Sequence, residues 1–138
     1  MTVHPSIFRA LLTDSQRGNY AARLFGARFV YLESFTFDTA GSLSSDYDGG
    51  YWHYYALSNG AFYMAPAHEG VMRVASDNGY DGEMSADAFG ITCCLYAYSL
   101  LSGSPNTAFA KMCTEQYHLL RAYMAEHEEL GAILAAVD

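Results

Sequence analysis

A short turn between two segments rich in aromatic rings constrains this chain more than any other feature. Residues 51–57 read YWHYYAL, residues 61–65 read AFYMA, and 58–60 (Ser-Asn-Gly) separate them. Asn and Gly both tolerate the positive φ that a tight hairpin turn requires, so we expect an antiparallel hairpin. A second turn at 66–70 (PAHEG) precedes 71–76 (VMRVAS), which predicts a third strand and a three-stranded antiparallel meander.

Helical periodicity dominates the rest of the chain. In 29–43 the apolar positions fit both a helix and a strand, and the length of the segment favours the helix. Ser85 is expected to begin a helix, with Asp87 in its first turn, where a carboxylate favours the helix dipole. Ser104 and Pro105 are expected to start the next helix after a stop at Gly103. The expected helices are 6–12, roughly 18–25, 29–43, 85–101, 105–124 and 130–137.

Length and composition indicate one folded α+β domain over residues 1–138. The chain has 138 residues, 51% of them hydrophobic and 16% charged, which excludes disorder as the main state. No repeat or Pro/Gly-rich linker divides it. We therefore predict the three-stranded meander packed against several helices.

The charge balance and the cysteines narrow the function classes. Seven basic residues against 15 carboxylates leave a net charge of −8, which disfavours binding to nucleic acid. The longest apolar run, 88–101, is too short to cross a bilayer, and residues 1–12 lack the features of a secretory signal. Three cysteines, Cys93, Cys94 and Cys113, are expected to be reduced. The expected location is the cytoplasm.

Common catalytic and cofactor patterns are missing. The loop 77–83 (DNGYDGE) resembles the start of a calcium-binding loop, but Gly79 and Ala88 stand at its third and twelfth positions, where ligands are needed. No histidine or cysteine spacing suits zinc, no GxSxG surrounds a serine, and no glycine-rich phosphate loop occurs. We expect no cofactor and no metal.

The meander geometry predicts two poles of loops, because alternate turns of antiparallel strands lie at opposite ends of a sheet. At one pole the 58–60 turn is expected to meet the 77–83 loop. At the other, two loop carboxylates are expected to approach the turn after the second strand. An alternative function follows from that second pole, a small cytoplasmic hydrolase. It would use His53 or His68 with Asp46, Asp48 or Glu69.

The strand rings offer a further alternative. Alternation puts one set of rings toward the core and the other toward solvent if helices cover only one face. An exposed aromatic patch would suit a protein partner or the interface of a dimer. The rings concerned are Tyr51, Trp52, Tyr54, Tyr55, Phe62 and Tyr63.

Four segments resemble one known family. They are GGYW at 49–52, LSNGAFYMAP at 57–66, NGYDGEMSADAFGI at 78–91 and EQYHLLRAY at 115–123, and a weaker RLFG stands at 23–26. Together they look like the ArdB/KlcA-type antirestriction proteins over about residues 23–130. The first twenty or so residues do not match, and Ala61 stands where relatives often have glycine.

The resemblance implies an α+β domain that counters host type I restriction-modification systems, so that incoming plasmid or phage DNA escapes cleavage. It implies binding without catalysis, with a type I restriction-modification complex or an associated host factor as partner. We expect a monomer that binds neither nucleic acid nor membrane. Residues of the matching motifs are the candidate interaction surface or scaffold: Trp52, Tyr54, Ser58, Asn59, Gly60, Asn78, Gly79, Gly82, Glu83, Ser85 and Asp87. For most of them, turn formation and helix capping are favoured over direct contact.

Overall fold

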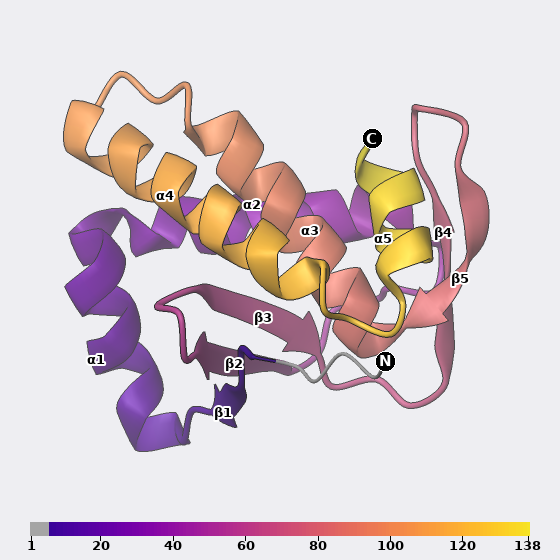
Figure 1. The fold of residues 1–138 in the computed structure, drawn as a ribbon, viewed down its shortest axis with the longest axis horizontal. Coiled ribbons are helices and arrows are strands. Elements are labelled where there is room, and N and C mark those ends of the chain that lie inside the picture. The colour runs from indigo at the N-terminus through magenta and orange to yellow at the C-terminus, as the bar shows by residue number, and fades with distance from the viewer. Residues whose placement is uncertain (1–5) are drawn as a thin grey trace.

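A computed structural model describes residues 6–138 and combines helices with two small antiparallel sheets (Figure 1). The α+β class and a three-stranded antiparallel sheet packed against helices are confirmed. The elements in chain order are β1 (Arg9–Leu11), α1 (Asp14–Phe25), the 3₁₀ turn η1 (Gly26–Arg28), α2 (Phe29–Leu43), β2 (Trp52–Leu57), β3 (Phe62–Pro66), β4 (Val71–Ala75), β5 (Asp81–Ser85), α3 (Ala86–Leu101), α4 (Thr107–Met124) and α5 (Leu130–Val137).

The three-stranded sheet has the order β1-β2-β3, so its third strand comes from the N-terminal segment. The helix expected over 6–12 is wrong, because Arg9–Leu11 pairs with β2. Ser58 fixes the start of this pairing: its backbone N–H donates to the Phe8 carbonyl (2.8 Å), and its hydroxyl accepts from the Phe8 N–H (2.9 Å). Helical periodicity over seven residues is too short a signal to exclude a strand.

The segment expected as the third strand of the meander pairs elsewhere. β4 pairs with β5 in a separate two-stranded sheet, and the expected loop 77–83 is a tight turn followed by that strand. Gly79 has a φ of 97° in this turn, and its N–H donates to the Ser76 carbonyl (3.1 Å). A hairpin turn in the same stretch accounts for the difference, because it pairs β4 with its immediate successor.

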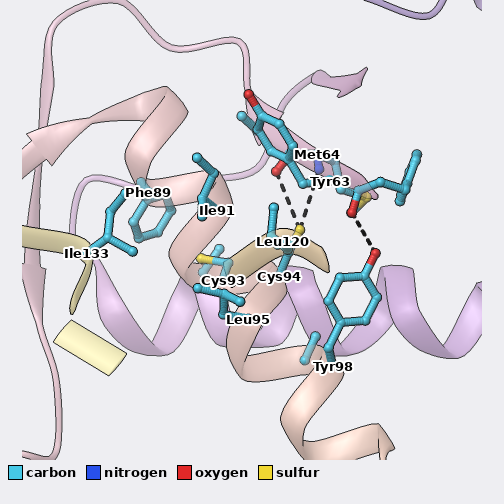
Figure 2. Close-up of a cluster of buried hydrophobic side chains, with 14 of the residues drawn as sticks. Tyr63, Met64, Phe89, Ile91, Cys93, Cys94, Leu95, Tyr98, Leu120 and Ile133 are labelled. Carbon is cyan, nitrogen blue, oxygen red and sulfur yellow. Dashed lines mark hydrogen bonds between the residues drawn. The ribbon is translucent and has the colours of Figure 1, made fainter. Parts of the chain in front are cut away.

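Side chains from α3 and α4 form hydrogen bonds with the backbone N–H and carbonyl groups at the outer edge of β3. The Phe62 N–H donates to Gln116 Oε1 (2.8 Å), and the Tyr98 hydroxyl donates to the Phe62 carbonyl (2.7 Å). The Met64 N–H and carbonyl both lie against Cys94 Sγ (3.4 and 3.6 Å; Figure 2). An edge strand that would otherwise expose unpaired backbone groups is thereby closed inside the core.

α3 is the central helix of the molecule. Twelve of its 16 residues are buried, and it packs against β3, α2, α4 and α5. Ser85 is its N-cap as expected, accepting from the Ala88 N–H (3.1 Å). The start expected for α4 is wrong by two residues, because Asn106 is the cap and accepts from the Phe109 N–H (3.0 Å).

Most of the aromatic side chains on β2 and β3 are buried in the core. Trp52, Tyr54, Phe62 and Tyr63 are buried, whereas Tyr51 is 52% exposed and Tyr55 half-buried. The exposed aromatic patch considered from the sequence therefore shrinks to these last two rings.

Two further features of the described residues bear on the sequence analysis: the state of the cysteines and the question of membrane-spanning helices. Cys93, Cys94 and Cys113 are free and buried, and burial raises the pKa of the Cys94 thiol to about 12. No helix within residues 6–138 is long and apolar enough to cross a membrane.

Candidate functional site

Asp87 is the centre of a polar network that joins four segments far apart in sequence. Its Oδ1 accepts from Arg9 Nη1 of β1 (2.5 Å) and from the Tyr63 hydroxyl of β3 (2.7 Å). Its Oδ2 lies 2.8 Å from Nε2 of His127, in the turn between α4 and α5. The first turn of α3 thus ties the N-terminal strand, the central sheet and the C-terminal turn together.

The contacts of His127 assign its tautomer. The Glu129 backbone N–H donates to Nδ1 (3.0 Å), so Nδ1 carries a lone pair and Nε2–H donates to Asp87. The Glu129 carboxylate in turn accepts from the Ser85 N–H (2.9 Å) and the Ser85 hydroxyl. Ser85 and Asp87, both predicted from the sequence, are therefore linked through the C-terminal turn.

Electrostatics keep Asp87 ionised despite its burial. Burial alone raises the pKa of this carboxyl, but hydrogen bonds from His127 and Tyr63 and the charge of Arg9 outweigh it and leave the pKa below 3.8. Burial and the neighbouring carboxylate raise the pKa of Tyr63 well above its usual range. Arg9 also stacks over the Tyr55 ring, 4.5 Å from its centre.

An open groove of about 340 Å³ lies beside this network. Its polar lining includes Arg9, His53, His68, Glu69 and Asp87. A second hollow of about 160 Å³ is lined by Asp46, Asp48 and His68, among others. The approach of Asp46 and Asp48 to His68 at one pole is thus confirmed, and Glu69 lies with His68 in the first groove.

The groove does not assemble the histidine–carboxylate pair that the alternative hydrolase function requires. Within residues 6–138, no hydrogen bond joins His53 or His68 to a carboxylate, and the same residues contain no cluster of three metal-ligating side chains. The one histidine that contacts a carboxylate in this part of the chain is His127, whose Nδ1 is already occupied.

The 58–60 turn docks on α4 and not on the 77–83 segment, so the other expected pole is wrong. Asn59 Nδ2 donates to the Leu119 carbonyl (2.9 Å), while its Oδ1 accepts from the Ala61 N–H (3.1 Å). Gly60 has a φ of 93°, and its carbonyl accepts from Gln116 Nε2 (3.0 Å). These contacts orient the hairpin against the helix.

The 76–80 turn docks on α5. Asn78 Nδ2 donates to the Ala135 carbonyl (2.9 Å) and the Ala136 carbonyl (3.2 Å). A Cβ on Gly82 would lie 2.5 Å from the Tyr80 hydroxyl, so the glycine leaves room for that ring. Glu83 is exposed on β5.

The side chains of Trp52 and Tyr54 are buried and held by hydrogen bonds. The Trp52 indole N–H donates to the Tyr47 hydroxyl (3.2 Å), and the Tyr54 hydroxyl donates to Glu33. The Arg17 guanidinium lies over the Tyr54 ring (3.7 Å) and donates to the Trp52 carbonyl (2.8 Å).

Sequence reasoning missed the partners of Asp87. Arg9, Tyr63 and His127 come from segments with no shared local pattern, so spacing along the chain could not group them. The available signal is a carboxylate in the first turn of α3, which by itself predicts only a favourable contact with the helix dipole.

Three comparisons with known proteins agree with one another. Residues 45–138 match the family described as "Antirestriction protein". The antirestriction protein KlcA of Escherichia coli is 40% identical over 132 residues, covering 92% of this chain and 90% of that protein, and a second KlcA of the same species is 37% identical. A solved structure reported for the KlcA and ArdB proteins superposes with a TM-score of 0.90 at 37% identity, covering 100% of this chain and 99% of the other.

The fold and the match together define the class: a small α+β protein of the kind that defends DNA against restriction. The chain belongs to the antirestriction protein family, and its resemblance to the ArdB/KlcA type is confirmed. The solved relatives are described as having a novel fold and antirestriction activity against type I DNA restriction systems in vivo but not in vitro.

Proposed function

We propose that this chain counters type I restriction-modification systems inside the cell and so protects incoming plasmid or phage DNA. The observation that carries the proposal is the full-length likeness to the KlcA/ArdB structure, with a TM-score of 0.90. The whole backbone that carries the binding surface is shared with that structure, at 37% sequence identity.

The protein acts by binding and not by catalysis, as a single-domain monomer in the cytoplasm. The hydrogen bonds of Asp87 and His127 support binding without catalysis, and the net charge of the chain supports a partner other than DNA. Asp87 already accepts hydrogen bonds on both oxygens, and His127 has both ring nitrogens engaged, so neither is poised to move a proton to or from a substrate. A net charge of −8 disfavours direct binding to DNA.

The partner is a type I restriction-modification complex acting together with a host factor. The solved relatives are described as active in vivo but not in vitro. An inhibitor that blocked the purified enzyme directly would act in both settings. A requirement for a further cellular component explains the difference with no change in the fold.

The motif residues serve as scaffold in this mechanism. Asn59 and Asn78 each use the side-chain amide to bind helix carbonyls, and Ser85 caps α3. Trp52 and Tyr54 are buried. Glu83, which is exposed, is the member of the motif set best placed for direct contact.

A plating experiment tests the function. Unmodified phage is plated on cells carrying a type I system, with and without expression of this chain, and modified phage on the same cells is the control. We expect the plating efficiency of unmodified phage to rise toward that of modified phage. Equal restriction with and without the protein, at matched expression, would contradict the proposal.

A second experiment tests the need for a host factor. DNA cleavage by a purified type I enzyme is measured with the protein alone and with the protein plus extract from cells that lack restriction genes. Inhibition that requires the extract supports the indirect route. Inhibition by the purified protein alone would contradict it and leave the antirestriction function in place.

A further inference from the structure

An apolar trough lies at the end of the molecule opposite the β4–β5 sheet. One hollow of about 480 Å³ lies between α2 and the α3–α4 connection, lined by Tyr31, Phe35 and Leu100. A second of about 370 Å³ lies between η1 and α4. Arg28 and Phe109 line both, so the two hollows adjoin, and we call them together the trough. Three of the helices that supply its lining, α1, α2 and α4, come together at the left end of Figure 1.

Large apolar side chains are unusually exposed along this trough. Leu100 is 60% exposed, Tyr31 50% and Phe35 36%. Eight large apolar side chains of residues 6–138 are this exposed, and three of them, Tyr31, Phe35 and Leu100, line the trough. Gathered apolar side chains of this kind mark interaction surfaces, whereas scattered ones do not.

The charge around the trough is opposite to the charge of the protein. No Asp or Glu lines either hollow, although the chain carries 15 carboxylates. Arg28 is the charged residue that lines both, and within residues 6–138 it forms no ion pair.

The other basic residues without an ion pair in the described chain are Arg23, Arg73 and Lys111. Arg23 belongs to the last turn of α1 and precedes Leu24 in sequence, and Lys111 belongs to the first half of α4 and precedes Met112; Leu24 and Met112 line the trough. Arg73, the remaining one, lies opposite Glu83 in the β4–β5 sheet. Of the four basic residues without an ion pair in the described chain, Arg28 thus lines the trough, and Arg23 and Lys111 are sequence neighbours of residues that line it.

We propose that this trough docks an amphipathic helix of a protein partner. The helix places apolar side chains, spaced at i, i+3, i+4 and i+7, along Tyr31, Phe35 and Leu100. Carboxylates on its flank pair with Arg28, with Arg23 and Lys111 as the further basic residues on the neighbouring helices. An apolar trough lined by Arg28 and by no carboxylate selects an acidic amphipathic helix over a basic one.

Two other occupants fit the charges less well. A second copy of this chain carries the same net charge of −8, and a two-fold interface through the trough would bring Arg28 toward its own twin. A membrane surface needs clusters of about four to eight basic residues, and the trough has three at most.

The test uses three synthetic peptides of about 18 residues, or roughly five helical turns. The first has leucines on one face and glutamates on its flanks, the second replaces every glutamate by lysine, and the third scrambles the first. Binding to the full chain is followed by fluorescence anisotropy of the labelled peptide. We expect the acidic helix to bind at least about tenfold more tightly than the other two.

Substitutions locate the binding. Leu100→Asp is expected to weaken the acidic peptide by tenfold or more, because it puts a carboxylate among the apolar contacts. Val71→Asp is the matched control, since Val71 is also exposed (57%) but lies on β4. Arg28→Glu, at an exposed position of η1, is expected to reverse the preference between the acidic and the lysine peptide.

Several results would overturn the proposal: equal affinity for the acidic and lysine peptides, equal affinity for the scrambled peptide, no binding at all, or the same loss from Val71→Asp as from Leu100→Asp. Dimerisation through the trough, seen by light scattering and removed by Leu100→Asp, would assign it to a second copy. Adsorption to anionic vesicles that Arg28→Glu removes would assign it to a membrane.

The proposed docking site and the proposed antirestriction function can be contradicted independently. Peptide binding is measured on the purified protein and does not depend on restriction. Wild-type protein without effect on plating would contradict the proposed function and leave the trough intact. Full activity of Leu100→Asp in the plating assay, together with lost peptide binding, would show that the trough serves a different partner.

Discussion

Replacing Gly90 by alanine tests whether α3 and β3 approach as closely as the structure indicates. Gly90 lies in the middle of α3, where alanine normally stabilises a helix by about 1 kcal/mol relative to glycine. Here, a Cβ at Gly90 would lie 2.4 Å from both the Ala65 Cβ and the Met64 carbonyl oxygen, and 2.5 Å from the Ala65 Cα. Two of these three atoms belong to the backbone and cannot move aside as a flexible side chain would.

The magnitude follows from two opposing effects. To bring the 2.4 Å contacts to an ordinary separation, α3 and β3 must part by about 1 Å, which also disturbs the contacts of Cys94 with Met64 (Figure 2). Overpacking of this kind costs about 3 kcal/mol, at the upper end of the usual range, because backbone is involved. Set against the helix-propensity gain of about 1 kcal/mol, Gly90→Ala should lower the free energy of unfolding by about 2 kcal/mol.

Thermal and urea unfolding followed by circular dichroism measure this loss. For a chain of this size, about 2 kcal/mol corresponds to a fall in Tm of roughly 6–8 °C. Gly18→Ala is the matched control: Gly18 is an exposed glycine within α1, and a Cβ there would meet nothing within 4 Å. We expect Gly18→Ala to raise Tm by roughly 2–4 °C. A Gly90→Ala protein as stable as wild type would refute the reasoning about the helix–sheet contact.

Three further outcomes are expected. Asn59→Ala should lower the stability by about 1–2 kcal/mol in urea unfolding, because the Leu119 carbonyl and the Ala61 N–H both lose their partner. The pKa of Asp87 is lower in the folded protein than its ordinary 3.8, so its contribution to stability is complete above that value and is lost as the pH falls through the folded pKa. The acid side of the stability–pH curve should therefore flatten in Asp87→Asn. An unchanged curve would argue against the network. Burial raises the pKa of the Cys94 and Cys113 thiols to about 12 and 11, so a thiol reagent at pH 8 should react slowly with the folded protein and rapidly in denaturant.

Local signals predicted the parts of this fold that depend on neighbouring residues. The 58–60 turn, the Ser85 cap and the 29–43 helix follow from turn chemistry, capping and length, and all three are present. Strand pairing over long distance was not predictable in the same way. β1 pairs with β2 across more than forty residues, and nothing in Arg9–Leu11 specifies that partner.

The candidate site likewise has one residue that local signals predict and several that they do not. Asp87 could be found because a carboxylate in the first turn of a helix has a local meaning. Its partners Arg9 and His127 could not, since each is brought to Asp87 by tertiary packing alone. The docking of Asn59 on α4 and of Asn78 on α5 likewise depends on where two helices come to lie.

The positions that identify the family and the positions available to a partner are largely different residues. A turn that must bind a helix carbonyl, as Asn59 and Asn78 do, tolerates few replacements, so it makes a recognisable motif while remaining a scaffold. A docking surface needs only apolar area and suitable charge, which many side chains supply; Tyr31 and Leu100 belong to none of the family motifs. Exposure therefore locates the partner surface better than motif resemblance does, and variants at Leu100 are expected to separate binding from folding where variants at Asn59 cannot.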